Sequence, residues 1–416
     1  MTHSPYWPVV THPTLRRLFP GITLSFIGDG IAVVAVVLLA QELTRSAVLV
    51  GLAVTASALP GAIGALTLGR WLTHRKGAEL ARWDALVRFV AIGLIPIAYF
   101  AGILDIGPYI GLLAISSVLH SWGTAGRFTL VADLLPEKDH LAGNALMAML
   151  AETGTIIGPP LAALILVFWN PAGALAVDAL TFGLLALSYH FVNTVTGASE
   201  KPPADASRSA GFAIIWRTPA LRYLILLSAG FFFFFGPVYV ALPILLGSDS
   251  GGAALLATFY TAFGVGAVVG GLIVPFVRGL SLWLVTVTGV LVVGLSLLPL
   301  GLGAPTVVSV VCFALGGLSW APYQATSMTL LQRTAPPGQL AQVLAANSAV
   351  ALLAAPAGIS VGGVLSAAFG ARNALLIASA TIMVIAAVAT GILLVLRRRS
   401  SGKDEAQHPP ASRDSP

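Results

Sequence analysis

Long apolar runs alternate with short polar stretches along almost the whole chain. Each run is about twenty residues or more, enough for a helix to cross the ~30 Å hydrocarbon core of a bilayer. Runs of this length cannot be the alternating ten-residue strands of a membrane barrel, so all of them are predicted to be helices. The twelve expected spans are near residues 18–40, 46–69, 84–104, 109–131, 141–167, 172–193, 221–246, 253–277, 281–301, 306–331, 341–367 and 373–396.

The two sets of six spans look like repeats of one another. The segment PTLRRL at residues 13–18 recurs as PALRYL at residues 219–224, and the same offset carries Gly30 onto Gly236 and Gly64 onto Gly270. A shared pattern at the head of two apolar runs indicates an internal structural repeat. The predicted organisation is a tail (1–17), a six-helix bundle (18–193), a linker (194–220), a second bundle (221–396) and a disordered tail (397–416).

Composition and charge agree with a multi-pass membrane protein. The chain is 57% hydrophobic and only 9% charged, with a mean hydropathy of +0.92. The net charge of +6 indicates topology and not nucleic-acid binding, because the basic residues lie between the apolar runs. With both termini in the cytoplasm, only Arg45 and Arg372 of the 22 Lys and Arg residues fall outside, which satisfies the positive-inside rule for a plasma membrane protein. A monomer in contact with membrane lipid is expected.

The first apolar run contains one carboxylate. Asp29 lies 12 residues after Arg17, roughly 18 Å into the membrane at 1.5 Å per residue. A carboxylate at this depth costs about 2.5–3.5 kcal/mol to insert, so it must face protein or water. Asp29 is therefore either a packing residue that hydrogen-bonds another helix or a site for a proton or a cation.

Several motifs resemble the major facilitator superfamily. The loop after the second span resembles that family's gating loop in the spacing of Leu72, His74, Arg75 and Gly77, with Asp84 and Arg88 following. It departs from the family's pattern where His74 replaces an aspartate and Ala78–Glu79 replace a basic pair. The fifth span contains Gly154, Gly158 and Pro159, which resemble the Gly-x-x-x-Gly-Pro motif of antiporters and are expected at the seam between the halves. Further motif residues resemble the branch of macrolide efflux proteins and siderophore exporters: Leu134, Pro136, Leu141, Asn144, Gln332, Arg333 and Pro336.

The resemblance implies two six-helix bundles whose first, fourth, seventh and tenth helices line a central cavity. Asp29 would face that cavity, with His120 and Arg127 on one face of the fourth helix placed opposite it. These three residues are candidates for proton coupling, and a static ion pair between two helices is the alternative. Glu152 on the fifth helix is a second protonation site, a cation-binding group or a hydrogen-bonding residue, whereas Asp178 on the sixth is read as structural.

The second half has no carboxylate within its expected spans, but its seventh and tenth helices carry aromatic and amide groups. Tyr239, Trp320, Tyr323 and Gln324 are the candidates for the substrate cavity, and aromatic walls suit amphipathic or cationic molecules. No nucleotide-hydrolysing, protease or esterase motif is present in the sequence, so an enzyme is not expected, and neither a cofactor nor a metal is predicted. The predicted function is proton-coupled export of hydrophobic or amphipathic small molecules by alternating access. One alternative is proton- or ion-coupled uptake of a nutrient, and another is a non-transporting membrane receptor or enzyme.

Overall fold

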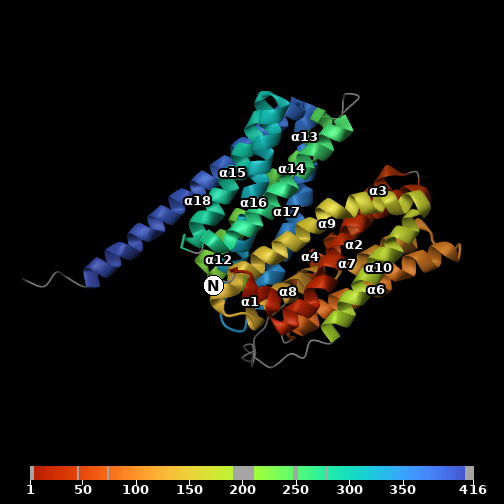
Figure 1. The fold of residues 1–416 in the computed structure, drawn as a ribbon, viewed down its shortest axis with the longest axis horizontal. Coiled ribbons are helices and arrows are strands. Elements are labelled where there is room, and N and C mark those ends of the chain that lie inside the picture. The colour runs from red at the N-terminus through yellow and green to blue at the C-terminus, as the bar shows by residue number, and fades with distance from the viewer. Residues whose placement is uncertain are drawn as a thin grey trace, which may run out of the picture.

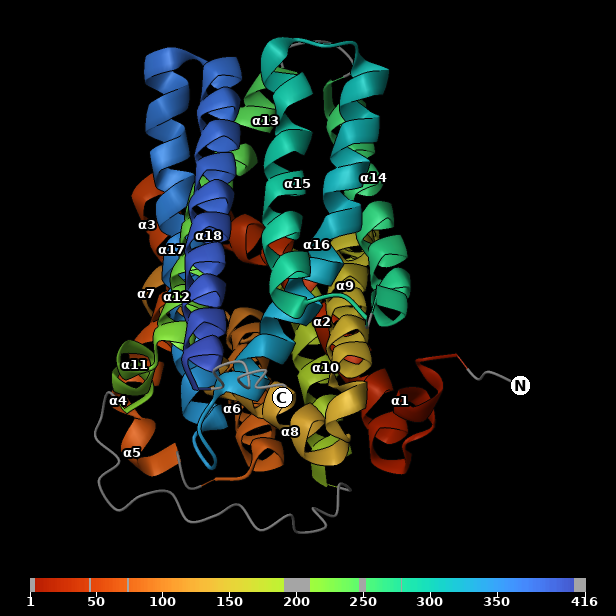
Figure 2. The same ribbon diagram turned by 90° about the vertical axis from the view of Figure 1, so that its left-hand side faces the viewer.

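The computed structural model describes residues 4–44, 46–72, 75–190, 210–246, 252–277 and 279–407. Within these ranges the chain is helical and forms two bundles, shown from two sides in Figures 1 and 2. The helices of the first half are α1 (Trp7–Thr11), α2 (Pro13–Leu43), α3 (Ala47–Ala56), α4 (Leu59–Thr67), α5 (Gly69–Leu72), α6 (Gly77–Phe100), α7 (Ile106–Ser117), α8 (His120–Leu134), η1 (Glu137–Asp139), α9 (His140–Phe168) and α10 (Pro171–His190). Those of the second half are α11 (Ala210–Arg217), α12 (Pro219–Phe235), α13 (Val238–Leu246), α14 (Gly252–Ile273), η2 (Val274–Val277), α15 (Leu282–Leu302), α16 (Thr306–Thr334), α17 (Leu340–Phe369) and α18 (Ala371–Gln407).

Ten helical segments of the described chain are long and apolar enough to cross a membrane, and the pair α3 and α4, bent by 42°, makes an eleventh. The expected fourth span is formed by α7 and α8, which are separated at residues 118–119. The predicted set of twelve spans therefore has a counterpart at every position. The main departures from twelve continuous helices are the bend in the second span and the breaks in the fourth and seventh, the last between α12 and α13 at residues 236–237.

The ends of the chain differ from the prediction. The expected tail at residues 1–17 includes α1 and the first turn of α2, which starts at Pro13 because proline is well suited to the first helical position. At the other end α18 continues past residue 396 to Gln407, where disorder was expected. Extending an existing helix is cheap, and Arg, Lys, Glu, Ala and Gln are good helix formers.

The internal repeat has a physical counterpart in the packing. Helices α2 and α12 both begin at a proline, at positions 13 and 219. A Cβ on Gly30 would collide with the backbone of Gly154 and Gly158 in α9, and a Cβ on Gly236 would collide with Gly358 in α17. The same close helix crossing thus occurs in each half, at glycine positions that let two backbones touch.

The glycine motif of α9 lies inside the first half and not at the seam between halves. A Cβ on Gly158 would lie 2.5 Å from the Cα of Gly30 on α2, which belongs to the same bundle. The expectation of a seam position is wrong because the opposite face of α9 makes the contacts with the second half. On that face Met149 and Ile156 lie against Gly271 and Gly264 of α14.

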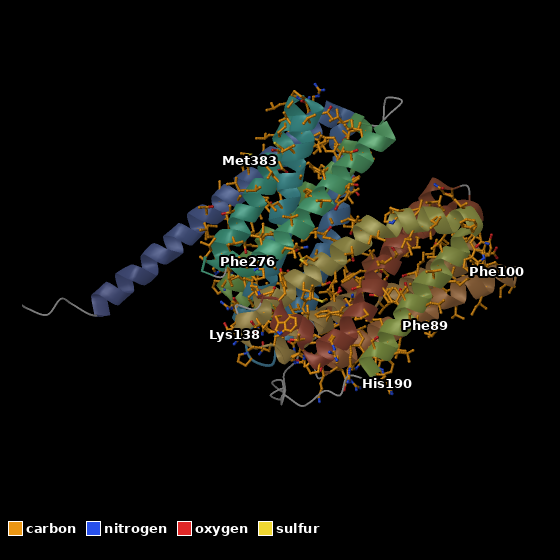
Figure 3. All side chains as sticks on the ribbon, in the orientation of Figure 1. Phe89, Phe100, Lys138, His190, Phe276 and Met383 are labelled. Atoms are coloured by element: carbon orange, nitrogen blue, oxygen red, sulfur yellow. The ribbon has the colours of Figure 1, made fainter. Side chains whose placement is uncertain are left out.

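Each half has its own hydrophobic core, and a third cluster joins them. The shared cluster includes Leu80 and Trp122 from the first half and Leu224, Leu331 and Val343 from the second. Between the halves, α8 and α4 pack on α17, and α9 packs on α14 and α16. The two bundles meet toward the end of the molecule that holds α1, Lys138 and His190, and they diverge toward α3 and α13 (Figures 1 and 3). The contact region between the halves is called the seam below.

Candidate functional site

A network of charged side chains lies inside the first half, centred on Arg88 of α6. Arg88 Nη1 donates to Asp29 Oδ1 on α2 at 3.0 Å, and Arg88 Nε donates to Asp84 Oδ1 one turn earlier at 3.3 Å. The remaining Nη2 donates to Nδ1 of His120 on α8. A single guanidinium therefore joins three helices, which its planar fork of five N–H donors makes possible.

Arg127 completes the network from α8. Its Nη2 lies 3.6 Å from Asp84 Oδ2, and its guanidinium carbon lies 5.4 Å from the centre of the Phe26 ring on α2. Arg88 is covered in a similar way by the Phe182 ring of α10 at 4.9 Å. Both cations are thus held between a carboxylate and an aromatic face, an arrangement that stabilises charge away from water.

The accessibility of these side chains differs sharply. Arg88, Asp84 and Arg127 are 8%, 3% and 5% exposed, whereas the Asp29 side chain is 37% exposed. Asp29 is therefore the carboxylate of this network that a proton or a small cation can reach. The rest of the network is enclosed by packed helices.

Two glycines make room for the network. A Cβ on Gly123 of α8 would collide with the carboxylate of Asp84. A Cβ on Gly28 would lie 2.5 Å from Asp178 Oδ1 on α10 and would also collide with the Thr181 hydroxyl. Asp178 thus lies against the backbone of the residue before Asp29, at the edge of the network.

These contacts revise the expected partners of Asp29. The sequence placed Arg127 opposite Asp29, but Arg127 pairs with Asp84 and the direct partner of Asp29 is Arg88. Asp84 and Arg88, which follow the loop motif at the start of the third expected span and were grouped with it as gating residues, are buried in α6. Their spacing of four residues in an apolar helix was the available signal, because buried opposite charges at this spacing pair on one face.

The remaining loop residues lie at the molecule's α1 end. Arg75 is exposed and pairs with Glu79 at 3.5 Å, and Leu72 is half-buried at the edge of the shared cluster. A Cβ on Gly77 would lie 2.7 Å from the carbonyl oxygen of Gly126, so this glycine lets α6 approach α8. His74 lies outside the described residues.

Glu152 and Trp320 meet between the two halves. The indole Nε1 of Trp320 on α16 donates to Glu152 Oε1 on α9 at 2.8 Å. The Trp320 ring also contacts Phe231, Phe235 and Phe263, with ring centroids 5.6–6.0 Å apart. A carboxylate is therefore held at the edge of an aromatic cluster, a contact that sequence reasoning missed because it joins residues 168 positions apart.

The other cavity candidates divide between surface and core. Tyr239 on α13 is 49% exposed and contacts the Phe235 ring edge to face at 5.7 Å. Tyr323 is 1% exposed and packs on Phe231 inside the second half, so it lies in the core and not on a cavity wall. Gln324, the next residue of α16, is half-buried.

A neutral hydrogen-bond group holds the halves together near α1. Asn144 Nδ2 of α9 donates to Thr329 Oγ1 at 2.9 Å and to Gln332 Oε1 at 2.7 Å, and Gln332 Nε2 donates to the Phe128 carbonyl at 3.0 Å. Close by, Arg333 Nε lies 3.0 Å from Glu137 Oε1, and both side chains are exposed. The motif residues of the two halves thus bind each other.

Among the described residues, no group of three or more His, Cys, Asp or Glu side chains is arranged to hold a metal ion. The arrangement instead offers a membrane-embedded ion network with one accessible carboxylate, and a separate aromatic cluster with its own carboxylate. Both lie in a molecule whose halves touch toward one end.

Similar proteins share this architecture over nearly the whole chain. The chain is 21% identical to macrolide efflux protein A of Streptococcus pyogenes over 379 residues, covering 89% of this chain and 94% of that protein. It is 28% identical to the enterobactin exporter EntS of Shigella boydii over 349 residues, covering 80% of each. A bacterial homologue of the iron transporter ferroportin in an outward-facing state superposes with a TM-score of 0.72 at 16% identity, covering 90% of this chain and 98% of that one.

The family model of the Major Facilitator Superfamily matches residues 18–358, which run from the first span into the eleventh, α17. The fold agrees with that match, since each half contains six spans and the halves repeat one another. The accessible acid on the first span and the contacts between halves suit a transporter that exposes one site alternately to two sides. This chain belongs to the Major Facilitator Superfamily and is a multi-pass secondary transporter with efflux-type relatives.

Proposed function

We propose that this protein exports amphipathic organic molecules across the bacterial plasma membrane, driven by protons that enter through Asp29. The observation that carries the proposal is the 3.0 Å contact between the accessible Asp29 and the buried Arg88. Protonation of Asp29 removes one charge from that pair and frees a guanidinium that also holds α6 and α8. A proton can in this way change the packing of three helices.

The direction of transport is inferred from the relatives and from the topology. Both relatives named above are described as an efflux protein and an exporter. The distribution of basic residues supports cytoplasmic termini, and with this orientation α1 and the closed seam would face inward. The structure then corresponds to the outward-open state, in which Asp29 meets the proton-rich side and takes up its proton.

Substrate contact is assigned to the aromatic cluster of the second half together with Glu152. Trp320 and Tyr239 supply flat apolar surface backed by the buried Phe235, and the Glu152 carboxylate at the edge of this cluster would attract a cationic group. In the structure the Trp320 indole, a neutral donor, forms a hydrogen bond with that carboxylate. A bound cation would replace this donor with a charged one. The proposed substrates are therefore hydrophobic or amphipathic molecules, including organic cations.

The test is a susceptibility panel in a host whose own efflux pumps are deleted. Expression of the wild type should raise resistance to a subset of hydrophobic compounds, and an uncoupler should abolish the gain. Asp29→Asn should lose the gain with normal expression, whereas Asp105→Asn, an exposed acid between α6 and α7, should keep it. Resistance conferred by Asp29→Asn, or increased uptake of the compounds by the wild type, would contradict the proposal.

A further inference from the structure

Asp178 of α10 is a buried carboxyl without a hydrogen-bond partner. The residue is 0% exposed, and both Oδ1 and Oδ2 are buried without a partner in the structure. A carboxylate in such a place would be costly, because its charge is neither hydrated nor hydrogen-bonded. A protonated, neutral carboxyl is far cheaper to bury there.

The charges of the surrounding network lead to the same protonation state. His120 accepts at Nδ1 from a guanidinium, which can only donate, so its ring is neutral at this contact. Two cations, Arg88 and Arg127, then face three carboxyls, Asp29, Asp84 and Asp178. Asp29 and Asp84 are ion-paired, so one proton on Asp178 leaves the network without net charge.

The charged groups around Asp178 come mainly from α2 and α6, the two helices with the most extensive packing on α10. Helix α2 supplies Asp29, and α6 supplies Arg88 and Asp84. On α8, His120 bonds to Arg88 and Arg127 pairs with Asp84. On α9, the titratable residues Glu152 and His140 have other partners: Glu152 is bonded to Trp320, and His140 to the backbone carbonyls of residues 132 and 135. Neither forms a hydrogen bond with the carboxyl of Asp178. Tyr189 lies three turns along α10 with a buried, unpartnered hydroxyl.

The position of Asp178 relative to Arg88 and Asp29 makes it an alternative ion-pair partner for Arg88. Asp178 lies against Gly28, the residue before Asp29, and Arg88 rests on the Phe182 ring one turn further along α10. A guanidinium released from Asp29 would find the carboxyl of Asp178 nearby. Arg88 can therefore pair with either acid, while the proton resides on the other.

We propose that Asp178 is a second proton-carrying residue that shares one proton with Asp29, and that Arg88 moves between them. In the state observed, Asp29 is ionised and bound to Arg88, and Asp178 holds the proton. When the proton resides on Asp29, Arg88 pairs with an ionised Asp178. No charge is created or lost in the exchange: one O–H bond breaks, one forms, and the guanidinium moves the opposite way.

This inference rests on the proposed role of Asp29 in coupling, but it is tested without a substrate. Protonated carboxyls are detected by their infrared C=O stretch in purified protein labelled with ¹³C at the aspartate side-chain carboxyls, which separates them from glutamate. At neutral pH the wild type should show a protonated aspartate band that Asp178→Asn removes. Tyr189→Phe, which removes another buried unpartnered group from the same helix, should leave the band unchanged.

The decisive variant is Asp29→Asn. It frees Arg88 to pair with Asp178, so the Asp178 band should disappear although that residue is intact. A purely structural, permanently protonated Asp178 would keep its band in Asp29→Asn, and this result would overturn the proposal, even if Asp178→Asn itself failed to fold. If Asp29→Asn loses the band but the wild type shows no proton-driven export, the shared proton is supported and the proposed function is contradicted.

Discussion

Arg88 and Asp29, 59 residues apart in sequence, form the contact on which the first half of the molecule depends, with Nη1 and Oδ1 3.0 Å apart. The same guanidinium binds Asp84 and His120, so its removal would leave two carboxylates without their shared partner. This contact gives α2, α6 and α8 a common centre that is ionic and enclosed by apolar packing.

Arg88→Gln should abolish transport and lower thermal stability, by about 3–5 kcal/mol if the loss resembles other broken buried ion pairs. Arg88→Lys should not restore activity, because one ammonium cannot reproduce the planar fork. Thermal unfolding in detergent and resistance assays measure the two effects. Arg75→Gln is the matched control, since Arg75 pairs only on the surface; equal losses for both arginines would refute the assignment.

The seam should respond to the loss of Asn144. Asn144→Ala removes the donors that hold Thr329 and Gln332 and should shift the protein toward the state closed at the α3 end. Spin labels at the exposed Thr55 and Ile244, in a Cys312→Ser background, should then report a shorter distance. Gln332→Ala should give a similar shift, and the double variant should change little more, because both residues belong to one group.

Gly158→Ala should destabilise the first half. The new Cβ would meet the Gly30 backbone at 2.5 Å, and overpacking of this kind typically costs about 1–3 kcal/mol. Gly363→Ala in α17 is the control, since nothing lies within 4 Å of a Cβ placed there. Melting temperatures of the two variants should differ clearly, and an unchanged Gly158→Ala would show that α2 and α9 can separate at no cost.

Glu152→Gln should separate substrates by charge. The amide keeps a hydrogen-bond acceptor for Trp320 but removes the charge, so resistance to cationic compounds should fall more than resistance to neutral ones. Trp320→Phe should weaken both groups, because it removes aromatic surface and leaves the carboxylate without its donor. A Glu152→Gln variant with the wild-type pattern toward both groups would exclude this acid from substrate binding.

The orientation is tested by labelling single cysteines in a Cys312-free background. Cysteines at Thr11 and Ser401 should resist an impermeant thiol reagent in intact cells, and one at Ser46 should react. Reaction at Thr11 from outside would reverse the topology inferred from the basic residues. The seam near α1 would then face outward, and the direction of the proposed proton movement would reverse with it.

Helix number, the repeat and the family could all be predicted from the sequence, because span length and loop charge are local properties. The partners of Asp29 could not. The packing of α2 and α6 on α10 decides that Arg88, and not Arg127, reaches Asp29. The glycines that make room for this network, Gly28 and Gly123, contact residues distant in sequence. Asp178 was read as structural because the sixth helix lies away from the central cavity in this family, although its position against Gly28 brings it to the network.

The seam described above is held mainly by amides, hydroxyls, apolar side chains and the Trp320–Glu152 hydrogen bond, while the ion pairs of Arg88 and Arg127 lie within the first half. The halves can therefore part without breaking the ion pairs of Arg88 and Arg127, and the carboxylate that loses a partner is Glu152, which is bonded to Trp320 across the seam. The ion pair Arg333–Glu137 crosses the seam in solvent, where such pairs contribute about 0–1 kcal/mol and are screened by salt. The balance between the two states should consequently change little with ionic strength, and a transporter built this way can operate in media of very different salinity.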